Sequence, residues 1–347
     1  MTGVVVTRFD GAAADWDACV RAQPGWTHFH LHGWRAVAGE ALGHDSIYLA
    51  ARDAATQAMV GVLPLVRVRS LIFGHFLVSM PFVNYGGPLG AADAVQALAA
   101  EAERIAANDR VKLLELRCRT SLAIDMPVSH RKLTVLLDLP GDADALMKSF
   151  PGKVRSQIKR PLKDGVEVRI GVEQLGAFYG VFAHHMRDLG TPVLSRRFFD
   201  TIARTFPNDV HVAVAYHQGV PIAGGVGFLW NGEFEITWAS ALRAYNSMSP
   251  NMLVYWELMA LMCRQGARVF NFGRCSRDSG TYRFKMQWGG REEQLWWYQR
   301  TRAAAPGAPA ATPSPDQSAY GLATRVWSRL PLAVTNRLGP AIVRLIP

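Results

Sequence analysis

A hairpin signal constrains the second half of this chain more than any other feature. Asn231-Gly232 joins two apolar, β-favouring runs at residues 221–230 and 233–241, and His217-Gln218-Gly219 separates these from a third run at residues 211–216. Asn and Gly both tolerate positive φ, which the type I′ turn of a two-residue hairpin requires. The sequence therefore predicts three consecutive antiparallel strands.

A helix and one more strand follow these three strands. Ser249 is a typical N-cap, Pro250 suits the first helical position, and Gly266 ends the predicted helix over residues 250–265. Residues 268–273 are short and apolar enough for a buried strand. The predicted order is three strands, a loop, a helix and a strand.

The first half of the chain repeats this order. It offers strands at residues 48–52, 60–69 and 76–83, a Gly/Pro loop at 84–90, a helix at 93–107 and a strand at 111–117. Arg117-Cys118 ends the last of these strands as Arg274-Cys275 ends its counterpart. The shared order and this local echo predict an internal duplication.

Composition supports two globular domains of a mixed α/β class. The chain has 347 residues, 49% of them hydrophobic, and four cysteines without a Cys-x-x-Cys pair. Disorder and a disulfide scaffold are therefore excluded, and the cysteines are expected to be reduced thiols of a cytoplasmic protein. Residues 70–92 and 210–232 carry no charge, but glycine and proline interrupt both, which favours buried strands over membrane spans. No secretion signal is expected at the N-terminus.

The positive charge is concentrated in two segments. Lys and Arg number 38 against 28 Asp and Glu, and residues 148–169 alone contribute a net +5. A basic helix is predicted over residues 142–163, and an Ala/Pro linker over residues 303–319. Residues 320–347 hold four arginines and no acid among apolar residues, so this amphipathic tail either lies peripherally on the inner membrane or docks on the protein.

The densest group of polar residues lies at positions 271–290. Here Asn271-Phe272-Gly273-Arg274-Cys275-Ser276 precedes Phe284-Lys285-x-x-Trp288-Gly289. This pattern resembles the C-terminal signature of the FemAB family, which consists of tandem GNAT-like acyltransferases that attach amino acids to cell-wall precursors. The resemblance extends over about residues 5–300, and the basic segment at 151–160 is similar to the start of the family's second half. The chain is most similar to the FemAB-like branch associated with exosortase (PEP-CTERM) and exopolysaccharide gene sets.

The resemblance implies that Lys285 faces the reacting acyl group. When an amine attacks a carbonyl, negative charge develops on oxygen, and a fixed ammonium in a desolvated cleft stabilises that charge more than it stabilises the ground state. A structural ion pair, or a side chain lying beside Trp288, is the alternative role for Lys285. Glu235 and Asp278 are candidate general bases, and the sequence does not rank them.

The remaining candidates would bind substrate. Arg274 and Arg277 follow a strand at a Gly-containing loop and suit phosphate or carboxylate groups, and a surface pair with Asp278 is the alternative role for Arg277. The loop at residues 245–251 is where a GNAT fold binds the pyrophosphate of its donor, yet the usual Gln/Arg-x-x-Gly-x-Gly/Ala pattern is missing there. The candidate binding residues are Arg274, Arg277, Tyr245, Asn246, Ser249, Asn251, Tyr282, Trp288, Lys153 and Arg155.

These observations predict an α/β (α+β, mixed-sheet) protein of two GNAT-like halves. The expected division is residues 1–140, a connecting helix at 141–165, a second half at 166–302, and then the linker and the tail. The implied reaction is aminoacyl or acyl transfer, from aminoacyl-tRNA or acyl-CoA, to an amine of a peptidoglycan or exopolysaccharide precursor. No metal and no tightly bound cofactor is expected. The alternative is a non-catalytic binding protein for a polysaccharide or a lipid-linked intermediate.

Overall fold

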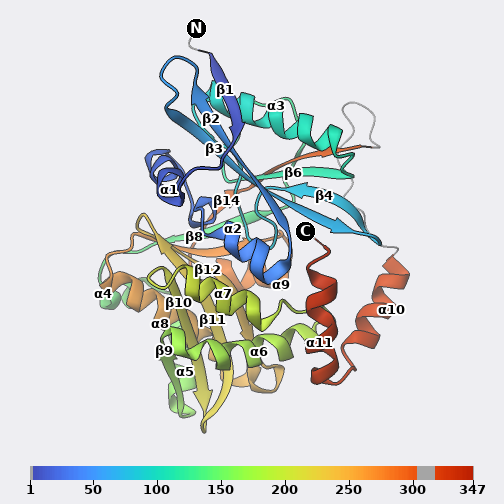
Figure 1. Ribbon diagram of the computed structural model, residues 1–347. Coiled ribbons are helices and arrows are strands. Elements are labelled where there is room, and N and C mark those ends of the chain that lie inside the picture. Colours follow the sequence, from blue (N-terminus) through green and yellow to red (C-terminus); the bar gives the residue numbers. More distant parts are fainter. Residues whose placement is uncertain (1–2, 303–316, 347) are drawn as a thin grey trace. The chain divides into compact units, whose positions relative to one another are not determined.

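The computed structural model describes residues 3–302 and 317–346. The chain divides into two compact units, each of which gathers segments far apart in the sequence. Of the described residues, the first unit comprises 3–132, 294–302 and 344–346, and the second comprises 133–293 and 317–343. Figure 1 shows both units as mixtures of helices and strands.

The first unit is built on a twisted mixed sheet with the strand order β1-β2-β3-β4-β6-β15-β7. Its helix α3 (Ala92–Asn108) packs on this sheet through an apolar face that includes Leu98, Ala102 and Ile105. Neighbouring strands are antiparallel except β4 and β6, which run parallel. The strands and short helices are β1 (Val4–Arg8), α1 (Ala13–Ala22), η1 (His28–His30), α2 (Trp34–Ala36), η2 (Val37–Ala41), β2 (Asp45–Asp53), β3 (Met59–Ser70), β4 (Gly74–Val78), β5 (Leu89–Gly90), β6 (Leu113–Cys118), β7 (Val128–Ser129) and β15 (Trp296–Thr301).

The second unit has the corresponding sheet, in the order β14-β8-β13-β12-β11-β10-β9. Its parallel pair is β12 with β13, at the place that β4 and β6 hold in the first unit. Its elements are β8 (Leu133–Asp138), α4 (Ala143–Ser149), α5 (Gly152–Lys163), β9 (Val166–Ile170), η3 (Val172–Gln174), α6 (Leu175–Asp188), α7 (Arg196–Thr205), β10 (Val210–His217), β11 (Val220–Trp230), β12 (Glu233–Ala241), η4 (Arg243–Met248), α8 (Pro250–Arg264), β13 (Val269–Cys275), α9 (Gly280–Met286), β14 (Arg291–Gln294), α10 (Gln317–Trp327) and α11 (Leu332–Val343).

Glycines let helices approach both faces of the second sheet. A Cβ on Gly224 would lie 3.2 Å from the ring of Phe178 in α6, whereas a Cβ on the next residue, Gly225, would lie 2.6 Å from Ile236 and 3.6 Å from Leu258 of α8. Because successive strand residues face opposite sides, α6 and α8 cover opposite faces. Two of the glycines that interrupt the uncharged segment, Gly224 and Gly225, are therefore contact points for helices.

Most of the predicted elements are present. The repeated order of three strands, a loop, a helix and a strand appears in both units, and Asn231 and Gly232 have the positive φ values of 43° and 75° that the turn requires. The mixed α/β fold predicted from the sequence is thus confirmed. Ser249 precedes α8 as expected, but its φ is 58° and its side chain makes no capping hydrogen bond.

Other segments differ from the predictions. The helix expected over residues 142–163 is interrupted at Phe150-Pro151, because proline disfavours the helical conformation of the residue before it. The tail contains helix α11, which includes Pro340 and packs against α6 in the second unit. The predicted linker falls largely on residues 303–316, outside the described residues, and residues 317–319 belong to α10.

The expected boundary at residue 140 differs from the observed division, because the units exchange strands. Strand β8, which follows the first unit in sequence, pairs with β13 in the second sheet. Strand β15, which follows the second unit, pairs with β6 in the first sheet. Each sheet therefore includes a strand that lies outside the repeated segment of three strands, a loop, a helix and a strand.

Candidate active site in the second unit

The candidate site starts where the parallel strands β12 and β13 separate. Their pairing covers only Glu233 to Glu235 against Val269 to Asn271. The register between β13 and β8 then shifts between Asn271 and Arg274, with Gly273 at φ 70°. This irregularity turns the backbone of β13 away from a regular ladder, as a bulge does.

Lys285 of α9 contacts this irregular part of the β13 backbone. Its side chain is only 3% exposed, and Nζ donates hydrogen bonds to the carbonyl oxygens of Gly273 at 2.5 Å and Arg274 at 2.9 Å. Helix α9 is held at its start by Ser279, whose Oγ accepts from the backbone N–H of Tyr282. Helix α9 is thus anchored by Ser279 at its start and by Lys285 near its end, and these contacts fix the position of the ammonium group.

Opposing effects act on the pKa of Lys285. Burial lowers its pKa from 10.5 to about 8, the neighbouring Cys275 and Glu235 raise it, and the positive charge of Arg274 lowers it further. The structure therefore brings together three residues predicted for the site, namely Lys285, Glu235 and Arg274. A lysine in this state changes its charge within a unit or so of neutral pH.

The two candidate bases lie in different surroundings. Glu235 is fully buried on β12, and its Oε1 accepts a hydrogen bond from Thr237 Oγ1 at 3.2 Å. Asp278 is exposed in the loop before α9, with φ at 67°, and its backbone carbonyl accepts from Arg283. Glu235 therefore influences Lys285 electrostatically from within the core, whereas the carboxylate of Asp278 is accessible to solvent.

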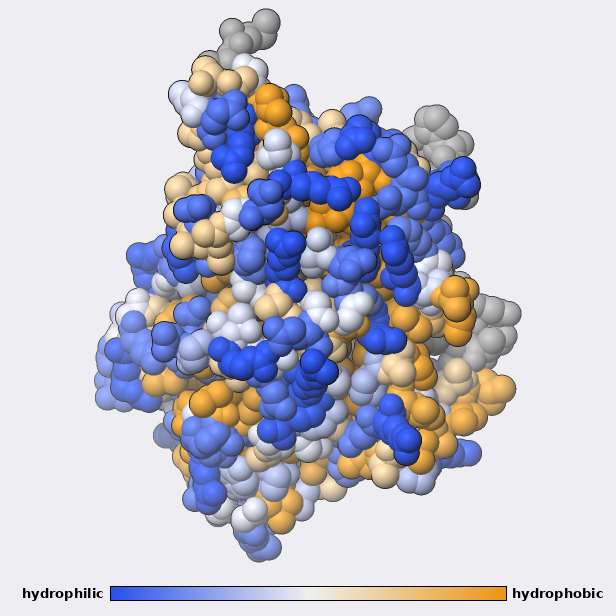
Figure 2. All heavy atoms as spheres, in the orientation of Figure 1, coloured by the Kyte–Doolittle hydropathy of each residue, from blue (hydrophilic) through white to orange (hydrophobic). Residues whose placement is uncertain are grey.

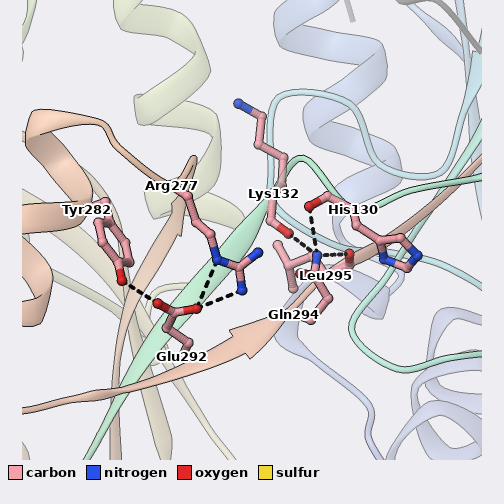
Figure 3. Close-up of polar contacts among 7 residues, drawn as sticks. All are labelled: His130, Lys132, Arg277, Tyr282, Glu292, Gln294 and Leu295. Carbon is pink, nitrogen blue, oxygen red and sulfur yellow. Dashed lines mark hydrogen bonds and ion pairs between the residues drawn. The ribbon is translucent and has the colours of Figure 1, made fainter.

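Arg277 pairs with Glu292 of β14 rather than with Asp278. Figure 3 shows Glu292 between Arg277 and Tyr282, and the distance from Arg277 Nη2 to Glu292 Oε2 is 2.8 Å. The hydrogen bond from the Tyr282 hydroxyl, followed by the interaction with Arg277, lowers the pKa of Glu292. The hydrogen bond to Glu292 raises the pKa of Tyr282 in turn. Glu292 was not among the predicted residues, because a glutamate in the charged run Arg291-Glu292-Glu293 is usually a solvated surface residue.

The predicted donor loop forms the 3₁₀ helix η4 and the start of α8. Tyr245 is partly buried and lies edge-on to His217, with ring centroids 6.0 Å apart, whereas Asn246 is exposed. Ser249 adopts a left-handed conformation directly before Pro250. Asn251 is partly buried, and its Oδ1 makes no hydrogen bond.

Three other predicted binding residues lie elsewhere. Trp288 is 1% exposed and packs in the core against Phe150 and Phe272, so it does not line an open channel. Arg155 donates to the carbonyls of Lys148 at 3.3 Å and Phe150 at 2.7 Å, and so ties α5 to the end of α4. Lys153, one turn before the centre of α5, is exposed.

The equivalent position of the first unit holds a different arrangement. Arg117 is buried, donates to Glu115 Oε1 at 2.7 Å and lies over the ring of Trp297 at 4.5 Å. Gln299 of the exchanged strand β15 donates to the other oxygen of Glu115 at 2.5 Å. Here the echo of Arg274 is part of a closed polar network.

An open cavity of about 350 Å³ adjoins that network in the first unit. The loop at residues 85–90, the residues that follow β6 and the segment around Thr27 line it. Arg119 lies over the ring of Tyr85 at 5.3 Å, and His30 is held by Thr27 and by the carbonyl of Gly87 at 3.0 Å. The cavity of the first unit is thus lined in part by cationic and aromatic side chains.

Comparisons with known proteins agree with this architecture. Residues 148–286 match the family model described as an acetyltransferase (GNAT) domain. Over 136 residues the chain is 24% identical to the UDP-N-acetylmuramoylpentapeptide-lysine N(6)-alanyltransferase of Weissella viridescens. The aligned region covers 37% of this chain and 40% of that enzyme's length.

Solved structures resemble nearly the whole chain. FemX superposes with a TM-score of 0.63 at 14% identity, covering 92% of this chain and all of FemX. A tandem GNAT protein from the clavulanic acid biosynthesis pathway gives a TM-score of 0.54 at 13% identity, covering 87% of this chain and 99% of that protein. L-PGS from Bacillus licheniformis gives 0.53 at 13% identity, covering 92% and 98%. The chain therefore shares its fold with these structures, one of which is described as a tandem GNAT protein, and residues 148–286 match the acetyltransferase (GNAT) domain model.

Proposed function

We propose that this protein is a FemAB-like N-acyltransferase. It would move an aminoacyl or acyl group from aminoacyl-tRNA or acyl-CoA to an amine of a cell-envelope precursor, in the cytoplasm. The GNAT domain match and the alanyltransferase relative support acyl transfer. The observation that carries the proposal is the buried Lys285, fixed at the separation of β12 and β13.

Lys285 would act as the oxyanion stabiliser. An ammonium has three N–H donors, and two of them are directed at the carbonyls of Gly273 and Arg274, which leaves the third for a substrate oxygen. As the amine forms its bond to the acyl carbon, the charge on the carbonyl oxygen increases, and the carbonyl re-forms as the bond from the acyl carbon to the leaving group breaks. The sulfur of CoA leaves as a thiolate, whereas the ribose oxygen of tRNA leaves as a hydroxyl by taking up the proton that the amine has lost. Asp278 would accept the proton from the amine, because it is the accessible carboxylate of the loop. Glu235 would keep Lys285 protonated.

The binding roles are assigned from location. Arg274 and the segment from Tyr245 to Asn251 would hold the donor. Arg277 and Tyr282, preset by Glu292, would contact phosphate or glycan groups of either substrate. The cavity of the first unit would be a further binding surface for a substrate group. The link to exosortase and exopolysaccharide systems stays part of this proposal.

A non-catalytic binding protein is the second candidate. The contacts of Lys285 with two backbone carbonyls would also stabilise the irregular β13 without any chemistry. Lys285 would then matter for stability alone, and ligand binding would lead to no product.

Product formation distinguishes the two candidates. The purified protein is incubated with acyl-CoAs, aminoacyl-tRNAs and an amine-bearing precursor, and acylated product is measured by mass spectrometry. Lys285→Met should lower the rate by about a hundredfold or more, the typical cost of losing one oxyanion donor. Lys163→Met, which removes an exposed lysine at the end of α5, is the matched control and should leave the rate unchanged. A folded Lys285→Met variant with full activity, or a wild type that binds donor without forming product, would refute catalysis by Lys285.

A further inference from the structure

The β3–β4 hairpin of the first unit ends in an exposed apolar tip. Leu71 and Ile72 are 107% and 80% exposed, and the adjoining Phe73 is 36% exposed. Figure 2 shows a hydrophobic patch at the place where Figure 1 draws this end of the hairpin. Two large aliphatic side chains displayed in sequence at a turn are unusual for a surface that meets only water.

The tip has a defined conformation. Ser70 Oγ accepts hydrogen bonds from the backbone N–H groups of Ile72 at 3.2 Å and Phe73 at 3.0 Å. Below the tip, Ser70 pairs with Gly74 and Arg69 pairs with His75 across the two strands. An ordered hairpin therefore presents the apolar side chains. Inserting these side chains into another surface requires little further ordering of the backbone.

Cationic side chains surround the base of the tip. Lys112 Nζ donates to the carbonyl of Phe73 at 3.4 Å, and the backbone N–H of Arg302 donates to the carbonyl of Lys112 at 3.2 Å. Arg69, Lys112 and Arg302 are all exposed. The nearby acid Asp109 is already paired with Arg67. An apolar tip with a basic collar suits a surface that has an apolar interior and an anionic rim.

We infer that this tip inserts Leu71 and Ile72 into the interface of an anionic bilayer, with Arg69, Lys112 and Arg302 among the lipid headgroups. Among the described residues, no helix is long and apolar enough to cross a membrane. Two or three apolar side chains fit a shallow, reversible attachment to the membrane. Each buried side chain and each basic residue then adds a small increment to the free energy of binding. This inference goes beyond the proposed acyl transfer and does not depend on it.

Vesicle co-sedimentation of the full chain tests the inference. The vesicles are phosphatidylcholine with or without phosphatidylglycerol, and the wild type should bind only the anionic ones. The double variant Leu71→Ser/Ile72→Ser should bind at least about tenfold more weakly, since it loses two insertable side chains. Leu162→Ser, at a 54% exposed leucine of α5, is the matched control and should bind as the wild type does. Arg69→Gln/Lys112→Gln should reduce the preference for phosphatidylglycerol.

A second pair of measurements distinguishes insertion of this tip into a bilayer from the alternative explanations. Ile72→Trp should show a blue-shifted emission on adding anionic vesicles, which reports burial of that side chain. The variant Leu322→Ser/Val326→Ser removes exposed residues of α10. If this variant alone abolished vesicle binding while Leu71→Ser/Ile72→Ser did not, the tail would be the anchor and the inference would be wrong. Concentration-dependent oligomers lost in Leu71→Ser/Ile72→Ser, without vesicle binding by the wild type, would instead identify a second copy as the partner.

Discussion

At the scale of single residues, the candidate site depends on how one lysine keeps its charge. Lys285 has lost most of its solvation, and the opposing influences of Glu235 and Arg274 leave its pKa at about 8. A group with this pKa is mostly protonated at neutral pH yet deprotonates with a small change in its surroundings. Its protonation state can therefore be read by two independent experiments.

The first experiment is a pH profile of activity. If protonated Lys285 is the active form, kcat/KM should fall as pH rises through about 8. Glu235→Gln removes a negative charge that raises the pKa of Lys285, so this limb of the profile should move to lower pH. A limb that stays in place in Glu235→Gln would show that another group controls it.

The second experiment measures stability against pH and needs no substrate. The folded-state pKa of Lys285, about 8, lies below its ordinary value of 10.5, so between these pH values the unfolded chain holds a proton that the folded chain has released. The contribution of Lys285 to the free energy of unfolding should therefore rise with pH over that window and be level below it. Lys285→Met should lack this rise in urea unfolding, relative to the wild type. Equal pH slopes for the two proteins would contradict a depressed pKa.

At the scale of elements, local patterns were predictable and contacts between distant segments were not. The Asn231-Gly232 hairpin, the helix after Ser249 and the repeat in the first half follow from short-range conformational preferences. Lys285, Arg274 and Glu235 could be named as candidates because a motif and strand positions mark them, and their roles stay predictions. Glu292 and Thr237 were not found, because their roles arise only when β14 and β12 are in place. Trp288 shows the opposite case, since an aromatic residue near a motif is core as readily as binding surface.

Helix α11 offers a test of element packing. A Cβ on Gly339 would lie 2.8 Å from the backbone nitrogen of Val193, whereas a Cβ on Gly321 of α10 would meet nothing within 4 Å. Gly339→Ala should therefore destabilise the docking of α11 by about 1–3 kcal/mol, the usual cost of overpacking. Gly321→Ala should be neutral or slightly stabilising, because alanine favours the helix. Urea unfolding and limited proteolysis of the tail measure both, and equal behaviour of the two variants would contradict tight docking.

At the scale of the whole chain, the exchanged strands determine what can fold by itself. This exchange could not be predicted from the sequence, because only the pairing with β13 or β6 decides which sheet β8 or β15 joins. Within the first unit the crossing segments are tied together, since Gln294 donates to the carbonyls of His130 at 3.1 Å and Lys132 at 2.7 Å (Figure 3).

Fragments test this organisation. Residues 1–140 alone lack β15, so Glu115 loses Gln299 and the edge of β6 is left open, and this fragment should not unfold cooperatively. Residues 1–132 joined by a short linker to residues 294–302 should fold, because all strands of the first sheet are then present. Circular dichroism during heating compares the two, and a cooperative transition in residues 1–140 would show that β15 is dispensable.

The exchange also sets an order of events during synthesis. The ribosome releases the chain from its N-terminus, and domains generally fold as units once their last segment has emerged. The first sheet cannot close until residues 296–301 have left the exit tunnel, by which time every strand of the second sheet is already available. The N-terminal half of this protein, although made first, is therefore the part that must wait, and a nascent chain stalled before β15 should present β6 to chaperones as an unpaired edge.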